Sequence, residues 1–257
     1  MKKGIYTGLK EFDLKLGGLH KKELVLIGAR PSQGKTAMAA RILYGACVEN
    51  GAAGLAFSLE MDKSRFLNRL AYLKAKIPVS KPRSGPLTTQ EEERLAKELS
   101  LISNAQIFVN DTTGLEAEEI CAKTRETIKD LKEKGRALDL MLIDYAQLIR
   151  GPVPPKTAIY IYDAAIALKA LAVELDICVV LFSQMSRGDS PPALSDFRPE
   201  SLSEYADKVF IIRRDRNINS VLNAVLSVAK NNNGLTGDID LKFFSEYAAF
   251  ENASDKY

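Results

Sequence analysis

The residues whose types and spacing most clearly suggest chemistry lie at positions 29–36, which read Ala-Arg-Pro-Ser-Gln-Gly-Lys-Thr. A small residue, four variable positions and Gly-Lys-Thr form the pattern of a phosphate-binding loop. In such a loop, backbone N–H groups bind phosphate oxygens, the lysine reaches the β- and γ-phosphates, and the hydroxyl binds Mg²⁺. We therefore expect ATP and Mg²⁺ as ligands. The expected nucleotide-binding residues are Ala29, Arg30, Pro31, Ser32, Gln33, Gly34, Lys35 and Thr36.

The flanking segments favour this interpretation over a chance Gly-Lys-Thr in a surface loop. Residues 23–28 form a short apolar run bounded by glycine, which is typical of a strand buried on both faces. Residues 36–49 are rich in Ala, Leu and Met and suit a helix. A phosphate-binding loop requires this order of strand, loop and helix.

Three further polar side chains follow predicted strands. Asp144 ends the apolar run 138–144, where its carboxylate could hold Mg²⁺ together with Thr36; a surface aspartate is the alternative. Glu60 follows the run 53–58 and could activate the attacking water, but a solvated glutamate at a helix start fits equally well. Gln184 follows the run 177–182 and could sense the γ-phosphate, although an ordinary loop glutamine fits slightly better.

Basic residues gather in the C-terminal third of the chain and in one proline-rich loop. Most such charges are simply solvated. As a set, they could line a groove for a nucleic-acid backbone or reach the nucleotide of an adjacent subunit. The residues concerned are Lys156, Arg187, Arg198, Arg213, Arg214, Arg216 and Lys230.

The remaining pattern predicts an α/β fold in which a mostly parallel sheet is flanked by helices. Strands are expected at 23–28, 53–58, 105–109, 138–144 and 177–182, and helices at 36–49, 63–74, 88–103 and 157–175. The runs 208–212, 221–229 and 239–244 follow with little helix between them, which predicts antiparallel strands that extend the parallel core. We expect a linker-like segment over 1–20 and one ATPase domain over 21–257.

Composition excludes several other classes of protein. The 257 residues carry a net charge of +3, which permits a polyanionic partner without requiring one. Apolar runs stay short of the roughly 20 residues that span a bilayer, so no membrane partner is expected. Three widely separated cysteines and one histidine disfavour a zinc site or disulfide framework and indicate a reducing cytoplasm.

Taken together, these segments resemble the C-terminal, RecA-like ATPase domain of DnaB-type replicative DNA helicases. The resemblance runs over almost the whole chain, from Tyr6-Thr7-Gly8 to about Asn252. It is strongest in the phosphate loop and in Phe-Ser-Leu-Glu-Met at 57–61. Further support comes from Ile-Asp-Tyr-Ala-Gln-Leu at 143–148, Leu-Lys-Ala-Leu-Ala at 168–172 and Ser-Gln at 183–184.

The resemblance implies a RecA-like fold that hydrolyses ATP at the subunit interfaces of a ring hexamer and moves 5′-to-3′ on single-stranded DNA. It implies that Glu60 activates water, Lys35 and Gln184 contact the γ-phosphate, and Thr36 and Asp144 hold Mg²⁺. The loops after Asp144 and Gln184 become the DNA-facing loops, with Lys156, Arg187 and Arg198 as candidate contacts. Primase or a helicase loader becomes a possible partner.

Two departures from the family pattern qualify this resemblance. The family usually has Lys-x-Arg-Asn-Gly near its end, where the arginine reaches into the neighbour's ATP site. Here Asn232 takes that place, so Lys230 or Arg214 becomes the candidate trans-acting cation. The family's N-terminal helical domain has no counterpart in the sequence. The alternatives to a helicase motor are a RecA-like ATPase without unwinding activity, which loads or binds DNA or joins mixed rings, and an interaction protein with a vestigial pocket.

Overall fold

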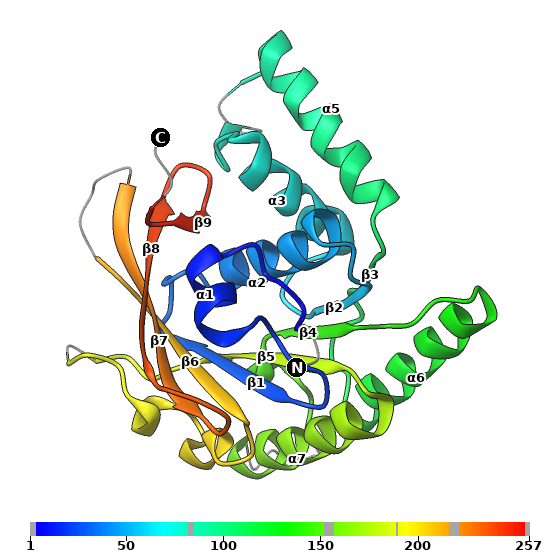
Figure 1. Cartoon of the computed structure of the whole chain (residues 1–257), viewed down its shortest axis with the longest axis vertical. Coiled ribbons are helices and arrows are strands. Elements are labelled where there is room, and N and C mark those ends of the chain that lie inside the picture. The colour runs from blue at the N-terminus through cyan, green and yellow to red at the C-terminus, as the bar shows by residue number, and fades with distance from the viewer. Residues whose placement is uncertain (1–3, 82–84, 152–156, 189, 216–220, 255–257) are drawn as a thin grey trace.

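A computed structural model describes residues 4–81, 85–151, 157–188, 190–215 and 221–254 of the chain (Figure 1). Its strands are β1 (Leu24–Ala29), β2 (Gly54–Ser58), β3 (Ile107–Asn110), β4 (Leu140–Asp144), β5 (Cys178–Gln184), β6 (Lys208–Arg214), β7 (Val221–Asn231), β8 (Gly237–Phe244) and β9 (Ala249–Asn252). Its main helices are α1 (Lys10–Leu16), α2 (Lys35–Tyr44), α3 (Lys63–Ala75), α5 (Thr89–Asn104), α6 (Ala117–Glu133) and α7 (Thr157–Leu175). A π-helical turn, Gly45–Glu49, prolongs α2.

All the described strands join one sheet, in the order β3-β2-β4-β5-β1-β6-β7-β8-β9. The pairs from β3 to β6 are parallel, and β7, β8 and β9 add antiparallel strands at one edge. The predicted mixed architecture is therefore confirmed, with one correction. The strand expected at 208–212 is parallel to β1, because the chain after β5 returns to the opposite end of the sheet before β6 begins. The antiparallel part thus starts one strand later.

The central strands β1, β2, β4 and β5 are buried on both faces, which explains their continuous apolar sequences. Val25 and Ile27 of β1 pack into the core beneath α1, α2 and α3, whereas Leu24 and Leu26 pack into the core beneath α6 and α7. Figure 1 shows α2 on one side of the sheet and α7 on the other. Alternate residues of one strand thus serve two cores, as the two-residue side-chain period requires.

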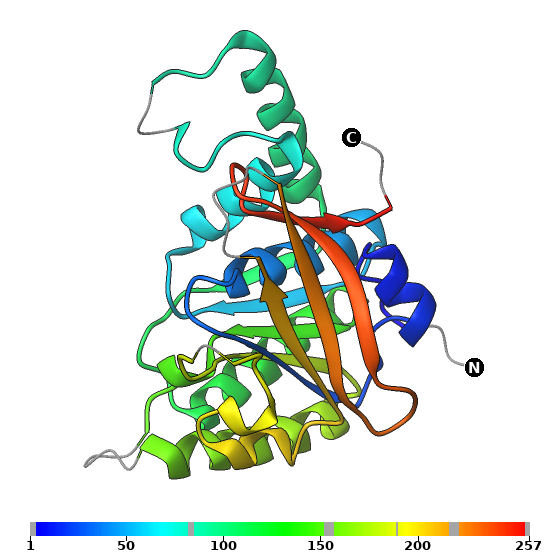
Figure 2. The same cartoon turned by 90° about the vertical axis from the view of Figure 1, so that its left-hand side faces the viewer.

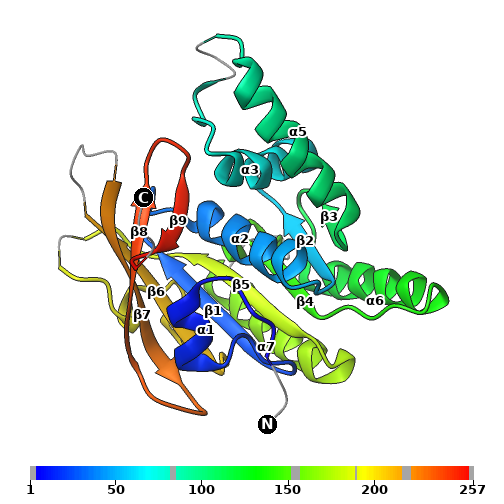
Figure 3. The same ribbon diagram turned by 45° about the horizontal axis from the view of Figure 1, so that its top comes forward.

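Helix α5 extends away from the sheet beside α3, as Figure 2 shows. Its predicted start is confirmed by a capping box in which Thr88 Oγ1 accepts from the Glu91 N–H at 3.3 Å and Glu91 Oε2 accepts from the Thr88 N–H at 2.8 Å. The Tyr44 hydroxyl donates to Glu98 at 2.5 Å and ties α5 to α2. In Figure 3, the β8–β9 hairpin lies beside α2 on the other side of that helix.

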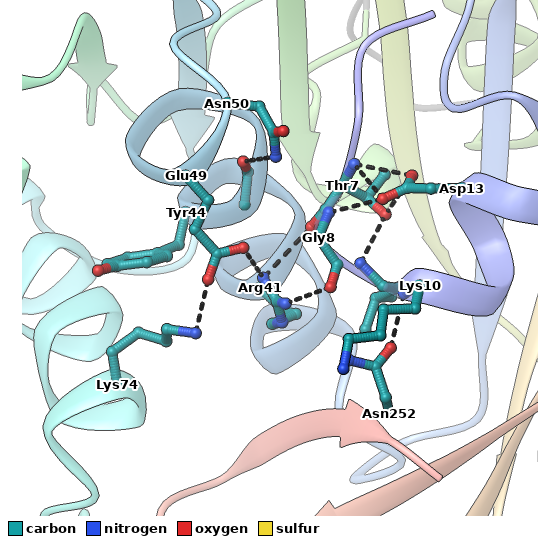
Figure 4. Close-up of polar contacts among 12 residues, drawn as sticks. Thr7, Gly8, Lys10, Asp13, Arg41, Tyr44, Glu49, Asn50, Lys74 and Asn252 are labelled. Carbon is teal, nitrogen blue, oxygen red and sulfur yellow. Dashed lines mark hydrogen bonds and ion pairs between the residues drawn. The ribbon is translucent and has the colours of Figure 1, made fainter. Parts of the chain in front are cut away.

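The described part of the linker-like segment, from Gly4 onward, packs against the body of the domain. Its helix α1 was not predicted, and Leu9 and Phe12 are fully buried. Arg41 of α2 donates to the carbonyl oxygens of Thr7 at 3.2 Å and Gly8 at 2.7 Å (Figure 4). The boundary expected at residue 20 therefore coincides with no break in packing.

Within the described residues, no helix combines the length and apolar character that a membrane span needs. The three cysteines are unpaired and buried, as expected of small core side chains.

Candidate nucleotide-binding site

The parallel strands β1, β2, β4 and β5 end at one edge of the sheet, and their last residues bring the predicted site together. In register, Ala29 lies beside Gln184, and Ser58 lies beside Asp144. The phosphate loop leaves β1 at this edge and opens α2. An open pocket of about 490 Å³ lies above it. Among its lining residues are Ser32, Gly34, Lys35, Thr36, Glu60, Arg69, Tyr145, Gln184, Arg214 and Phe243.

Gly34 is required by both backbone and space. Its φ of +101° lies in the region that side-chain-bearing residues rarely adopt. A Cβ at this position would also come within 2.9 Å of the Phe250 ring. The glycine therefore lets the loop turn tightly into α2, whose first residues line the pocket. The free N–H groups at the start of a helix favour an anion.

Lys35 is nearly buried at the floor of the pocket. Its Nζ lies 3.4 Å from Gln184 Oε1 and 5.0 Å from the centre of the Tyr145 ring. Burial lowers the pKa of Lys35, and the nearby carboxylates of Asp144 and Glu60 oppose that shift. The ammonium group is thus confined between an amide and a ring, and the two carboxylates act on it electrostatically. Phosphate oxygens are suitable additional partners for it.

Asp144 and Thr36 form the part of the pocket that suits a divalent cation. Asp144 is 1% exposed, and the Thr36 hydroxyl hydrogen-bonds to its carboxylate. Burial raises the pKa of Asp144 to about 6, Glu60 adds to this, and the Thr36 hydrogen bond, Lys35 and Arg69 oppose it. The Oδ1 atom is buried and has no hydrogen-bond partner. An unpartnered carboxylate oxygen beside a threonine hydroxyl fits Mg²⁺, which prefers oxygen ligands and retains waters.

Glu60 lies exposed on the rim of the pocket, in the turn after β2. The Leu59 N–H donates to the Asp144 carbonyl oxygen at 3.1 Å, which holds the turn beside β4. The Ser58 hydroxyl donates to the Met61 carbonyl oxygen at 2.7 Å and closes the turn. The Glu60 carboxylate therefore faces open pocket space, where a water molecule can approach it.

Arg69 also lines the pocket, although the sequence reasoning did not select it. It comes from α3, whose start is capped by Asp62, with Oδ1 accepting from the Arg65 N–H at 2.9 Å. Burial lowers the pKa of Arg69, and the charges of Asp144 and Glu60 act in the opposite direction. The sequence feature that could have pointed to Arg69 is a basic residue nine positions after Glu60, in the predicted helix that follows.

Arg214, a trans-acting candidate, lies instead on the phosphate loop of its own chain. Its guanidinium donates to the Ser32 carbonyl oxygen and stacks 4.0 Å from the centre of the Phe243 ring. Its backbone N–H donates to Gln33 Oε1 at 3.1 Å. The parallel pairing of β6 with β1 puts Arg214 here, and this long-range pairing is not visible in the sequence. Arg214 therefore lines this chain's own pocket, and its trans-acting role stays a prediction.

Lys230 and Asn232 lie at the opposite end of the sheet. The Asn232 N–H donates to the Asp207 carbonyl oxygen at 2.9 Å, and the Asp207 carboxylate accepts from the Leu24 N–H at the start of β1. The phosphate loop follows the other end of β1, about 20 Å away at roughly 3.3 Å per residue. Lys230 Nζ is bound to the carbonyl oxygens of Ser203 at 3.1 Å and Glu204 at 2.8 Å. Neither residue can reach this chain's own pocket.

The DNA-binding candidates divide into two groups. Lys156 lies outside the described residues. Arg187 and Arg198 are both exposed and belong to the loop of residues 185–199, which leaves β5 directly after Gln184. The guanidinium of Arg198 donates to the carbonyl oxygens of Ser195 and Phe197, at 2.7 Å each.

The Arg30 side chain turns into this same loop, so any contact of Arg30 with the nucleotide would come from its backbone. Its guanidinium donates to the Gly188 carbonyl oxygen and to Asp196 Oδ2, the latter at 3.2 Å. The side chain is 9% exposed, and Arg30 is not among the residues that line the phosphate pocket. Arg30 therefore joins the phosphate loop to the loop after β5.

Comparison with known proteins identifies the group to which this architecture belongs. The family model of the DnaB-like helicase C terminal domain matches residues 4–252. The chain belongs to the DnaB-like helicase family. It is 32% identical to the replicative DNA helicase DnaC of Bacillus subtilis over 271 residues, which cover 99% of the chain and 58% of the relative. It is also 32% identical to the replicative DNA helicase DnaB of Geobacillus stearothermophilus, with the same coverage.

Solved structures agree with this membership. One of them, itself an ATPase domain, superposes with a TM-score of 0.86 at 30% identity, covering 98% of this chain and 92% of that one. A DnaB-like replicative helicase studied for its interactions with primase gives a TM-score of 0.85 at 30% identity and covers 98% of this chain and 64% of that one. The RecA-like fold is thereby confirmed. The chain spans less than two thirds of the length of the curated relatives named above.

Proposed function

We propose that this DnaB-like chain is the ATP-hydrolysing motor of a replicative DNA helicase. The observation that carries the proposal is the buried Asp144, whose carboxylate has an unpartnered oxygen and lies beside the half-buried Thr36 and the buried Lys35 where the phosphate loop follows β1. Parallel α/β sheets bind ligands at the edge where their strands end. Mg²⁺ would be the cation partner of the carboxylate and hydroxyl oxygens, and the oxygens of a triphosphate would be partners of the lysine. The curated relatives are named as replicative DNA helicases.

In the proposed reaction, water attacks the γ-phosphorus of ATP and ADP leaves. The Glu60 carboxylate accepts a proton from the attacking water and aligns it. Lys35 stabilises negative charge on the transferred phosphoryl group, and Gln184 contacts the same group through its amide. Thr36 and Asp144 would hold Mg²⁺, which when bound neutralises charge on the β- and γ-phosphates. The phosphate-loop backbone from Ser32 to Gly34 binds the remaining phosphate oxygens.

The proposed active unit is a ring, hexameric as in the family, in which each site is completed by the next chain. The turn that carries Asn232 supports this arrangement, because it lies at the end of the sheet away from its own pocket and is exposed. Single-stranded DNA is the proposed track, contacted by the loop of residues 185–199 through Arg187 and Arg198. Primase or a helicase loader is a proposed partner, and the three free thiols suit work in the cytoplasm.

The test is ATP hydrolysis measured with and without single-stranded DNA across a range of protein concentrations, together with separation of a forked duplex. The proposal predicts DNA-stimulated hydrolysis whose rate per subunit rises steeply with concentration, because neighbours complete each site. Blunt duplex DNA is the control and should stimulate weakly. Hydrolysis without strand separation at any concentration would contradict the helicase assignment and support an ATPase that loads or binds DNA. Absence of hydrolysis would contradict the motor itself.

A further inference from the structure

Gln147 lies in a short 3₁₀ turn, Ala146–Leu148, that follows β4 three positions after Asp144. Its side-chain amide satisfies both backbone polar groups of Gln184. Oε1 accepts from the Gln184 N–H at 2.9 Å, and Nε2 lies 3.2 Å from the Gln184 carbonyl oxygen. The same nitrogen lies 2.9 Å from Ser183 Oγ. The amide thus adds side-chain hydrogen bonds to the end of β5, beyond the last backbone pair of β4 with β5, Ile143 and Leu181.

The same amide also contacts the far end of the loop of residues 185–199. Gln147 Nε2 lies 3.3 Å from the carbonyl oxygen of Arg198, the exposed residue proposed to contact DNA. The loop therefore starts and ends at one side chain. Two of its described residues are held separately, because Arg30 of the phosphate loop binds the Gly188 carbonyl oxygen and Asp196.

An amide nitrogen carries only two hydrogens. Gln147 Nε2 has three acceptors within reach, on Ser183, Gln184 and Arg198, so they share the two hydrogens. A displacement of Gln184 by a few tenths of an ångström would redistribute the hydrogens between its carbonyl oxygen and that of Arg198. Such a displacement has a source, since Gln184 Oε1 lies 3.4 Å from Lys35 Nζ, where a γ-phosphate would compete for the lysine.

We infer that Gln147 is a positioning residue that couples occupancy of the nucleotide pocket to the placement of Arg198. The amide does so because it contacts both ends of the loop after β5, and its N–H groups can shift their hydrogen bonds between the carbonyl oxygens at those two ends. This inference rests on the proposed function, because it assigns the nucleotide to Lys35 and Gln184 and DNA to Arg198. It adds a residue that the sequence reasoning gave no role.

The test uses Gln147→Glu in the full chain. A carboxylate of nearly the same shape still accepts from the Gln184 N–H but donates to neither carbonyl oxygen. Affinity for a fluorescent oligothymidylate is measured with and without a non-hydrolysable ATP analogue, and the ratio of the two affinities reports the coupling. We expect that ratio to fall by about fivefold or more, in the usual range for coupled sites. Gln90→Glu, on the exposed start of α5, is the matched control and should leave the ratio unchanged.

A second variant and a melting curve separate coupling from misfolding. Gln147→Asn keeps the donors on a side chain too short to reach both ends of the loop, so it should also lose the coupling. The inference is overturned if both folded variants, with melting temperatures near that of the wild type, keep the wild-type ratio. A wild-type protein whose DNA affinity ignores the nucleotide would overturn it as well. In that case the failure would extend to the proposed function, whereas unchanged ratios in the variants alone would leave that function standing.

Discussion

The guanidinium of Arg214 donates a hydrogen bond to the carbonyl oxygen of Ser32, in the phosphate loop of its own chain. Its stacking on Phe243 holds it there at the mouth of the pocket. The neighbouring strand residue Arg213 turns the other way and binds Ser227 Oγ at 2.7 Å and Asp238 Oδ2 at 2.9 Å. Two adjacent arginines thus have different environments, and only Arg214 supports the phosphate loop.

Arg214→Ala should weaken ATP binding by about 10-fold, because a hydrogen bond from a charged group contributes about 1.5–3 kcal/mol. The measurement is calorimetric titration at a protein concentration low enough to keep the chains apart. Arg213→Ala is the matched control and should bind ATP like the wild type. Unchanged binding by dilute Arg214→Ala, with a defect that emerges only on assembly, would restore Arg214 to a trans-acting role.

Asn232→Arg should increase ATP turnover of the assembled protein by at least about tenfold, since an arginine finger contributes roughly 10³–10⁵ in systems where it is present. The side chain at 232 is exposed on a turn whose backbone is fixed to Asp207, so the substitution leaves packing intact. Leu235→Arg adds the same charge to the same turn, at an 89% exposed position, and should give no gain. Equal rates for both variants would show that position 232 does not reach a neighbour's phosphates.

Asp144→Asn should reduce ATP turnover by about 100-fold or more and raise the Mg²⁺ concentration needed for half-maximal rate. A carboxylate that holds the metal supports a charge stabilisation worth several kcal/mol. Chelation with EDTA should abolish turnover in the wild type. Asp139→Asn, at the other end of the same strand segment, removes a partner of Lys21 and the Ala53 N–H and should leave the Mg²⁺ dependence unaltered. Identical Mg²⁺ curves for Asp144→Asn and the wild type would exclude Asp144 from the metal site.

Arg41→Ala should lower the free energy of unfolding by about 3 kcal/mol, because it removes the donor to the buried carbonyl oxygen of Thr7 and the half-buried carbonyl oxygen of Gly8. Arg41 is 2% exposed and also pairs with Glu49 at 3.2 Å. Urea denaturation provides the measurement. Lys74→Ala removes the other cation of Glu49 from a more exposed position and should cost at most about 1 kcal/mol. Similar losses for the two variants would mean that Arg41 does not anchor the N-terminal segment.

The sequence predicted the parts of the fold that short-range patterns encode. Short apolar runs marked the parallel strands β1 to β5, and a Thr at 88 or 89 followed by a Glu at 91 or 92 marked the start of α5, which the structure places after Thr88. Helix α1 is only seven residues long and β9 only four, so neither carries a clear period. β6 is parallel because it pairs with β1, which is distant in the sequence, and no local sequence pattern predicts that pairing.

The candidate site divides in the same way. Thr36 could be predicted as a site residue because it begins a predicted helix, and Asp144 because it ends a predicted strand. Parallel strands end at the same edge of a sheet, where ligands bind. The position of Arg214 beside its own phosphate loop could not be predicted from the sequence, because it follows from the register of β6 against β1. Gln147 was passed over because its importance lies in contacts with Gln184 and Arg198, whose loop folds back only in three dimensions.

The most direct test of the account compares steady-state ATP hydrolysis by the wild type and by Lys35→Ala, with single-stranded DNA and Mg²⁺ at saturation. Lys35 Nζ lies at the floor of the pocket beside Gln184, whereas Arg30, the other cation of the phosphate loop, turns away from it. The account predicts turnover by the wild type and at least about a 100-fold loss in the variant, because charge stabilisation at a transferring group is worth about 3–4 kcal/mol. Normal hydrolysis by Lys35→Ala would contradict the assignment of this loop as the phosphate site.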